Sequence, residues 1–294
     1  MNTNIKADYD LKKKLLHTTY DNERPILNIL LANKKSCHKD HSTDYIPHTS
    51  KWDVEYYKCV QEIFSTVYGC PETVPKDIMN SFWHTYKFAL QFYYPEYFRP
   101  NEFETNMLST PTSEKIDGLS ISFPPHKNNR TLDLKYAQYY QKMNQNLIKL
   151  NAETTWIDFL IANYDKFEKV HKHAAFQKFA QLTHTIGNIA IVPRGLNTSR
   201  SRYAFDYWDY TLLSLKDSFS TLDGELWKTY IHSYHLNSYV DENYEILPLW
   251  STHFTSDGYM PQTEKEFNEF LHTVNAHIVK RGEKIMNAYT QLTK

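Results

Sequence analysis

Glycine is scarce in this chain, which holds only seven glycines in 294 residues. Average proteins use about 7 % glycine. A β-sandwich or a doubly wound α/β sheet needs more glycine for its turns and phosphate-binding loops. Helix-period patterns of apolar residues instead recur along most of the chain. The sequence therefore predicts a mainly α protein, of the α+β type, with one minor, short-stranded β element.

Proline divides the predicted helical protein into three parts. Residues 95–130 contain five prolines and one glycine, a composition typical of an extended arm or linker rather than a helix. We expect an N-terminal helical part over residues 1–94 and a C-terminal helical domain over residues 131–294. The predicted molecule is thus a helical globular protein that carries a Pro-rich extended arm.

Capping and stop signals place the helices within these parts. Ser50 precedes one helix and Gly69 ends it, because glycine adopts the left-handed backbone that often closes a helix. Thr263 and Glu266 form a capping box at the start of another helix, and Gly282 predicts its end. Helices are expected at about 51–68, 75–94, 131–150, 155–171, 173–183, 206–219, 224–236, 264–281 and 282–294, and a strand is expected within 186–193.

The charge balance predicts no strong attraction to a polyanion. Charged residues make up 23 % of the chain and the net charge is -1, so we expect no direct contact with nucleic acid. The 23 tyrosines contribute to an aromatic content of 15 %. Tyrosine combines a large ring with a polar tip, which suits a big core or a protein–protein interface. Codon usage in an AT-rich genome accounts for the same excess.

The N-terminus and the cysteines predict a cytoplasmic protein. The first residues carry charges where a signal peptide has an apolar run. Three cysteines form no CxxC pair, and such an odd count is typical of a reducing compartment. No window approaches 18 consecutive apolar residues, so we expect no membrane span.

A histidine-rich stretch is the first candidate metal site. Cys37, His38, His41 and His48 lie close together in the sequence. Zinc needs three or four ligands that converge on a tetrahedron, and the spacing here matches no known zinc motif. The chain has 14 histidines, so such clusters arise by chance. We interpret the stretch as a solvated loop and expect no metal and no cofactor.

Motifs of nucleophilic and phosphate chemistry do not occur in the sequence. The chain contains no G-x-S-x-G elbow, no G-x-x-x-x-G-K-[ST] loop and no G-x-G-x-x-G turn. Its carboxylates are spread evenly, so no acid–base pair is evident. We therefore assign no catalytic residue and expect a protein that is not an enzyme.

Residues 184–216 form the most informative stretch, with a clean strand signal and a dense run of Arg, Asp and aromatic residues. Its basic loop offers guanidinium groups that could hold phosphates or a partner's carboxylates. Asp206 and Asp209 follow closely and could pair with the same groups inside the molecule. Both interpretations stay open for the three arginines of the loop, Arg194, Arg200 and Arg202.

The segment HTIGNIAIVPRGLNTSRS resembles the distal half of HNH-like nuclease domains. In that family a histidine and asparagines help to form a metal-dependent ββα site for phosphodiester hydrolysis. The matching positions are His184, Gly187, Asn188, Pro193 and Asn197. The upstream D/E-H-x-x-P segment, which supplies the general base or a metal ligand, is missing here. A metal-dependent nuclease or nucleic-acid-binding protein with a degenerate active site is therefore the alternative function.

The same residues have a purely structural interpretation. His184 precedes a buried strand and would cap a helix end or bind a backbone carbonyl. Gly187 and Asn188 would serve backbone geometry, because both residue types tolerate positive φ. Three aromatic residues at helical spacing most simply belong to the core: Trp227, Tyr230 and Tyr234.

A longer signature, TIGN-x-x-x-x-P…(F/L)N…R…DYWDLTL, is shared with uncharacterised bacterial and phage proteins that this chain resembles. The resemblance extends through SYHLNSYVDENYEILPLWSTH to NEFLHTVNAHIVKRGEKIM and covers roughly residues 184–286. It marks a family without indicating a mechanism. The signature residues that we expect to be structural are His184, Gly187, Asn188, Pro193, Asn197, Asp206, Trp208 and Asp209.

In its length and helical character the whole chain also resembles the Gabija anti-defence proteins of phages. Those proteins are non-enzymatic inhibitors that bind the bacterial Gabija nuclease–helicase, oligomerise around it and prevent it from acting on DNA. The resemblance implies a homo-oligomer in the host bacterial cytoplasm, with the Gabija complex as its partner. The residues that we expect to contact this partner are Tyr97, Phe98, Arg99, Phe103, Arg194, Arg200 and Arg202.

Overall fold

The computed structural model describes a mainly helical protein with one small antiparallel sheet. This confirms the fold class that the sequence predicts. The described residues are 23–37, 51–71, 74, 76–80, 82–94, 160–193, 212, 215–216, 219, 223–250, 261 and 263–294. The predicted arm at 95–130 and the predicted helix at 131–150 lie outside these residues.

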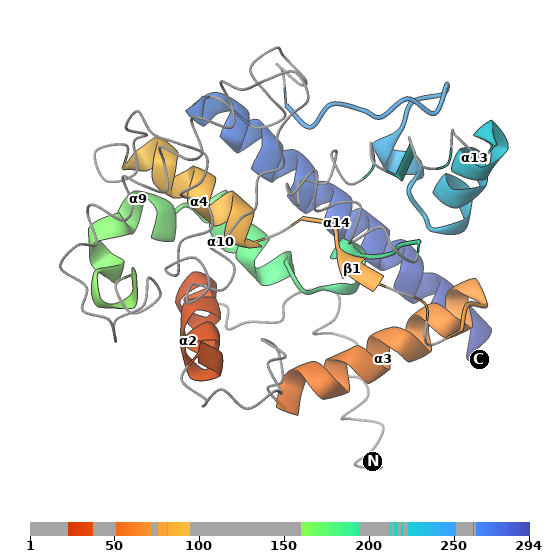
Figure 1. Cartoon of the computed structure of the whole chain (residues 1–294), viewed down its shortest axis with the longest axis horizontal. Helices are drawn as coiled ribbons and strands as arrows, with labels where there is room; N and C mark the ends of the chain where they lie inside the picture. Colours follow the sequence, from red (N-terminus) through yellow and green to blue (C-terminus); the bar gives the residue numbers. More distant parts are fainter. Residues whose placement is uncertain are drawn as a thin grey trace, which may run out of the picture.

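Helix α14 (Glu264–Leu292) is the long axis around which the described elements gather, and it runs diagonally through Figure 1. Helix α10 (Ala174–Leu182), helix α3 (Lys51–Tyr68) and the 3-10 helix η3 (Ile186–Asn188) all contact it. Its buried side chains recur every three to four residues, so one face stays in contact with the core along the helix. They include Phe267, Phe270, Leu271, Val274, Ile278, Arg281, Ile285, Met286 and Tyr289.

The start of α14 confirms one local prediction, but its continuation contradicts another. Thr263 accepts a hydrogen bond from the backbone N–H of Glu266, and the Glu266 carboxylate accepts one from the N–H of Thr263. This is the capping box that the sequence predicts. The predicted stop at Gly282 is wrong, because α14 continues through it to Leu292. Burial of Ile285 and Tyr289 beyond the glycine outweighs the helix propensity that glycine loses.

Shorter helices surround this axis. Helix α2 (Pro25–Cys37) packs on α10, and α4 (Phe82–Tyr93) packs on α9 (Glu168–His171). The 3-10 helix η2 (Tyr164–Phe167) precedes α9, so the single helix predicted for 155–171 is wrong in its described part. The backbone of Asn163 leaves helical geometry there, with φ -110° and ψ 26°.

The sheet consists of strands β1 (Lys76–Ile78) and β2 (Ile189–Ile191), which pair antiparallel with Lys76 opposite Ile191. The sequence predicts β2 within 186–193, and the structure confirms a strand there. The sequence also predicts a helix from residue 75, and that prediction is wrong as far as Ile78. Three residues carry too little pattern to identify a strand whose partner lies far along the chain.

Helix α13 (Gly224–Ser233) lies at the upper right of Figure 1 and is followed by the 3-10 helix η5 (Asn237–Tyr239). The Asp223 side chain caps α13 by accepting a hydrogen bond from the N–H of Glu225. At the other end His235 adopts a left-handed φ of 58°. The N–H of Leu236 then bonds to the carbonyl of Ile231, which closes the helix in the manner of a Schellman turn.

Candidate functional site

The TIGN turn, residues 185–188, is a buried structural element that joins neighbouring segments. Asn188 is fully buried. Its Oδ1 accepts hydrogen bonds from the backbone N and from Nδ2 of Asn80, at 3.1 and 3.2 Å. Its Nδ2 donates to the carbonyls of Asn80 and Thr183, at 3.0 and 2.7 Å. Both functions of the amide are therefore engaged in tying the end of β1 to η3.

Gly187 serves close approach rather than a left-handed turn. A Cβ built on this residue would lie 1.9 Å from the carbonyl oxygen of Ile278 and 2.9 Å from the backbone N of Gly282. The turn therefore rests directly on the backbone of α14. The expectation of positive φ at Gly187 and Asn188 is wrong, because the described residues with positive φ are Gly69, His235 and Tyr244.

The two edges of β2 are completed by different means. On one edge β1 pairs with the strand, and the N–H of Met79 continues the ladder to the carbonyl of Asn188 at 2.8 Å. On the other edge Arg281 Nη1 donates to the carbonyls of Gly187 and Ile189, at 2.8 and 2.7 Å. Side chains thus satisfy carbonyl groups that a third strand would otherwise bind.

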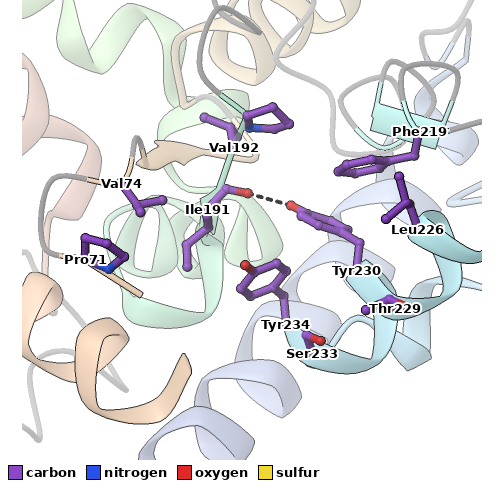
Figure 2. A pocket seen from close by; sticks show the side chains of 11 residues that line it. Pro71, Val74, Ile191, Val192, Phe219, Leu226, Thr229, Tyr230, Ser233 and Tyr234 are labelled. Atoms are coloured by element: carbon purple, nitrogen blue, oxygen red, sulfur yellow. Dashed lines mark hydrogen bonds between the residues drawn. The ribbon is translucent and has the colours of Figure 1, made fainter. Parts of the chain in front are cut away.

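Tyr230 continues that second edge. Its hydroxyl donates to the carbonyl of Ile191 at 2.6 Å, and Figure 2 shows this bond crossing from α13 to β2. The same side chain forms part of the wall of a pocket. From Ile191, the last residue of β2, to Pro193 the chain therefore lines this pocket.

The pocket has a volume of about 530 Å³ and lies between β2 and α13. Pockets of about 300–1,000 Å³ are typical of binding sites. In Figure 2 the tyrosine rings of α13 point toward β2, while Phe219 and Leu226 stand at the opposite end from Pro71 and Val74. The described residues that line it are Pro71, Val74, Ile191, Val192, Pro193, Phe219, Leu226, Thr229, Tyr230, Ser233 and Tyr234.

The described lining of this pocket is electrically neutral at ordinary pH. It contains no Asp, Glu, Lys, Arg or His. Burial raises the pKa of the Tyr230 hydroxyl well above its usual range, and burial also raises the pKa of Tyr234. Both hydroxyls therefore keep their protons. The lining combines apolar surface with hydroxyl groups that can donate or accept hydrogen bonds.

The structure describes four of the signature residues expected to be structural. His184 is half-buried, Gly187 and Asn188 hold the turn, and Pro193 lines the pocket. The others, Asn197, Asp206, Trp208 and Asp209, lie outside the described residues. So do all the residues expected to contact a partner: Tyr97, Phe98, Arg99, Phe103, Arg194, Arg200 and Arg202.

The histidine-rich stretch from Cys37 to His48 falls outside the residues whose side chains are described. Across the described part of the chain, no group of three His, Cys, Asp or Glu side chains is arranged to hold a metal ion. Within the same part, no helix combines the length and the apolar character that a membrane span requires.

Sequence reasoning missed the role of Arg281 and underestimated that of Tyr230 and Tyr234. The tyrosines share one face of α13, but they line a pocket as well as the core. Arg281 stands on the apolar face of α14, between Ile278 and Ile285. A charged residue in such a stripe is a signal, because arginine is almost never fully buried without partners.

The chain was compared with protein families, curated proteins and solved structures. No family model, no curated protein and no solved structure matches the chain. The described contacts that bear on binding are those of the pocket lining and the hydrogen bonds around it.

Proposed function

We propose that this protein acts by binding another protein and covering its surface, without chemistry of its own. The observation that carries the proposal is the pocket of about 530 Å³ between β2 and α13, whose described lining residues carry no charge. Its hydrophobic lining suits the apolar or aromatic side chain of a partner, since such anchors in desolvated pockets dominate protein–protein affinity. The hydroxyls of Thr229, Ser233 and Tyr234 supply hydrogen bonds for the partner's backbone.

An exposed leucine extends the pocket toward the surface. Leu226 lines the pocket and is 42 % exposed. A large apolar side chain that is exposed to water at the edge of such a pocket suits a contact that becomes buried on association. A carboxylate or an ammonium group from a partner would lose hydration here without meeting an opposite charge among the described lining residues.

The partner in this proposal is the one that the resemblance to Gabija anti-defence proteins implies. We propose a phage-encoded inhibitor that binds the bacterial Gabija nuclease–helicase as a homo-oligomer in the host cytoplasm and blocks its access to DNA. Light scattering tests the oligomer, and a monomer at all concentrations would count against this arrangement. Asn188 weighs against the alternative of a metal-dependent nuclease, because both functions of its amide are engaged in structural hydrogen bonds.

The decisive experiment measures plasmid cleavage by the purified Gabija complex while this protein is titrated in. Inhibition should reach completion at a fixed stoichiometry. The protein alone with Mg²⁺ or Mn²⁺ should leave the plasmid intact. Cleavage by the protein alone at substoichiometric amounts, abolished by a chelator, would establish the nuclease alternative instead.

A matched pair of leucines localises the contact. Leu226→Asp places a carboxylate at the pocket mouth and should weaken inhibition at least about tenfold. Leu247 is 38 % exposed, nearly as much as Leu226, but it does not line the pocket. Leu247→Asp should therefore inhibit like the unmodified protein. Equal inhibition by both variants would place the contact elsewhere.

A further inference from the structure

The two walls of the pocket come from separate parts of the chain. Ile191, Val192 and Pro193 belong to β2 and the residues after it, whereas Tyr230 and Tyr234 belong to α13 and its C-terminal end. One hydrogen bond, from Tyr230 to the carbonyl of Ile191, joins the walls directly. The width of the pocket therefore depends on what holds each wall in place behind its surface.

One side chain on α14 reaches the backbone behind both walls. Arg281 Nη1 donates to the carbonyls of Gly187 and Ile189, which lead into the β2 wall. Its Nε donates to the carbonyl of Tyr234, at 3.1 Å, in the α13 wall. The guanidinium is planar and its N–H groups diverge at fixed angles. The two backbones are therefore held at a fixed separation and orientation.

The bond to Tyr234 also fixes the end of α13. Tyr234 follows the last residue of that helix, where backbone carbonyls lack partners within the helix. A cation at this end interacts favourably with the helix dipole. Arg281 thereby fastens the turn of α13 that presents Tyr230 and Tyr234 to the pocket.

The surroundings of Arg281 indicate a role in geometry rather than in an ion pair. The side chain is 1 % exposed, and it donates hydrogen bonds to the backbone carbonyls of Gly187, Ile189 and Tyr234. Burial raises the pKa of Tyr68 to about 12, so the tyrosine stays neutral beside the guanidinium. Burying such a charge costs free energy, and in return it links two segments that no apolar side chain could link.

We infer that Arg281 is a positioning residue for the pocket: it sets the separation of the β2 and α13 walls and so determines which side chain of a partner fits between them. The inference rests on the proposed function only for the consequence on partner binding. The effect on the pocket itself can be measured without any partner.

The test places spin labels on the two walls, at Pro193→Cys and Thr229→Cys, in a background where Cys37, Cys59 and Cys70 are serine. Pulsed electron resonance then reports the distribution of distances across the pocket. The otherwise unmodified protein should give a single narrow distribution. Arg281→Lys should broaden it, because one ammonium group cannot satisfy both walls. A broad distribution in the protein that retains Arg281, or a narrow one in folded Arg281→Lys, would overturn the inference.

Asn275→Ala is the matched control for loss of a buried polar side chain on the same helix. Asn275 Nδ2 donates to the carbonyl of Ala175, which belongs to α10 and does not line the pocket. This variant should lose stability and keep the narrow distribution. The same broadening in Asn275→Ala would reduce Arg281 to a general stabiliser of the fold and overturn the inference.

Inhibition of the Gabija complex separates this inference from the proposed function. Arg281→Lys with a broadened distribution and weakened inhibition supports both. A broadened distribution with undiminished inhibition supports the role of Arg281 in the pocket and contradicts the proposed use of the pocket.

Discussion

The turn before β2 and the pocket after it are neighbours in sequence, but the turn is tightly packed and the pocket is open. In the turn, Asn188 engages its whole amide with the protein, and Gly187 leaves no space above α14. In the pocket, Leu226 and Thr229 are exposed, and the space between the walls is about 530 Å³. The Asn188 amide inside the turn is engaged in holding the fold, whereas the pocket lining includes the hydroxyl-bearing residues Thr229, Ser233 and Tyr234.

The comparison teaches that an asparagine in a motif-like stretch of sequence can serve the fold alone. Asn188 resembles a residue of a nuclease motif, but its contacts are those of a joint between β1, η3 and the end of α10. The packed turn ends and the pocket lining begins at Ile191, whose carbonyl accepts a hydrogen bond from Tyr230. Substitutions on the two sides should therefore differ strongly in their effect on stability.

Gly187→Ala should have the largest effect. The new methyl group would meet the backbone of α14 at 1.9 Å, and neither backbone can move without disturbing the core. We expect a loss of more than about 4 kcal/mol in the free energy of unfolding. Chemical denaturation followed by circular dichroism measures it.

Gly224→Ala is the control for this glycine, because nothing lies within 4 Å of the position of its Cβ. It begins α13, where alanine should be neutral or stabilising by up to about 1 kcal/mol. If Gly187→Ala were as stable as Gly224→Ala, the close approach of the turn to α14 would be contradicted.

Asn188→Ala should cost about 3 kcal/mol, because it leaves buried groups of Asn80 and Thr183 without their partner. Asn237→Ala is a suitable comparison, since that side chain is exposed and bonds to His232 at the surface. Its loss should change the free energy of unfolding by less than about 0.5 kcal/mol. If urea titration gave the two variants the same loss in free energy of unfolding, the hydrogen bonds of Asn188 would stabilise the fold no more than a surface contact does.

His171 is a second buried polar side chain with both ring nitrogens hydrogen-bonded, and its contribution to stability should depend on pH. His171 Nδ1 donates to the carbonyl of Tyr164 at 2.6 Å, and its Nε2 accepts the hydroxyl proton of Tyr86 at 2.7 Å. A carbonyl can only accept, which fixes this neutral tautomer. Burial lowers the pKa of His171 from 6.5 to about 4.

The unfolded chain therefore binds a proton at a higher pH than the folded protein does. The stability contributed by His171 is complete above pH 6.5 and is lost as the pH falls toward 4. Between about pH 7.5 and about pH 5 we expect this group to remove about 2 kcal/mol. Denaturation at both pH values measures the change. His171→Gln should be less stable at neutral pH and should show a smaller loss on acidification; an unchanged loss would assign the pH dependence to other groups.

Thr229→Lys should have the smallest effect on stability, less than about 0.5 kcal/mol, because this residue is exposed at the pocket. The same substitution should weaken inhibition, since it brings a charge to a pocket whose described lining residues are uncharged. Thermal unfolding and the cleavage assay measure the two effects. A large loss of stability would show that the pocket wall is as tightly packed as the turn.

Much of the fold follows from short stretches of sequence, but the candidate site does not. Thr263 and Glu266 mark the start of α14, Gly69 ends α3 with a φ of 62°, and the apolar run before Pro193 contains β2. Strand β1 shows no such signal, because its three residues become a strand only by pairing with β2. The pocket likewise needs α13 and β2 to be brought together.

The sequence alone determined the mainly helical character, because caps and apolar periodicity act over a few residues. Only the tertiary structure decided that α14 continues through Gly282, that Gly187 rests on its backbone, and that Arg281 links β2 to α13. Arg281 lies 94 residues from Gly187 and 47 from Tyr234. Hydrogen bonds over such separations depend on how the helices pack, and no local pattern records them.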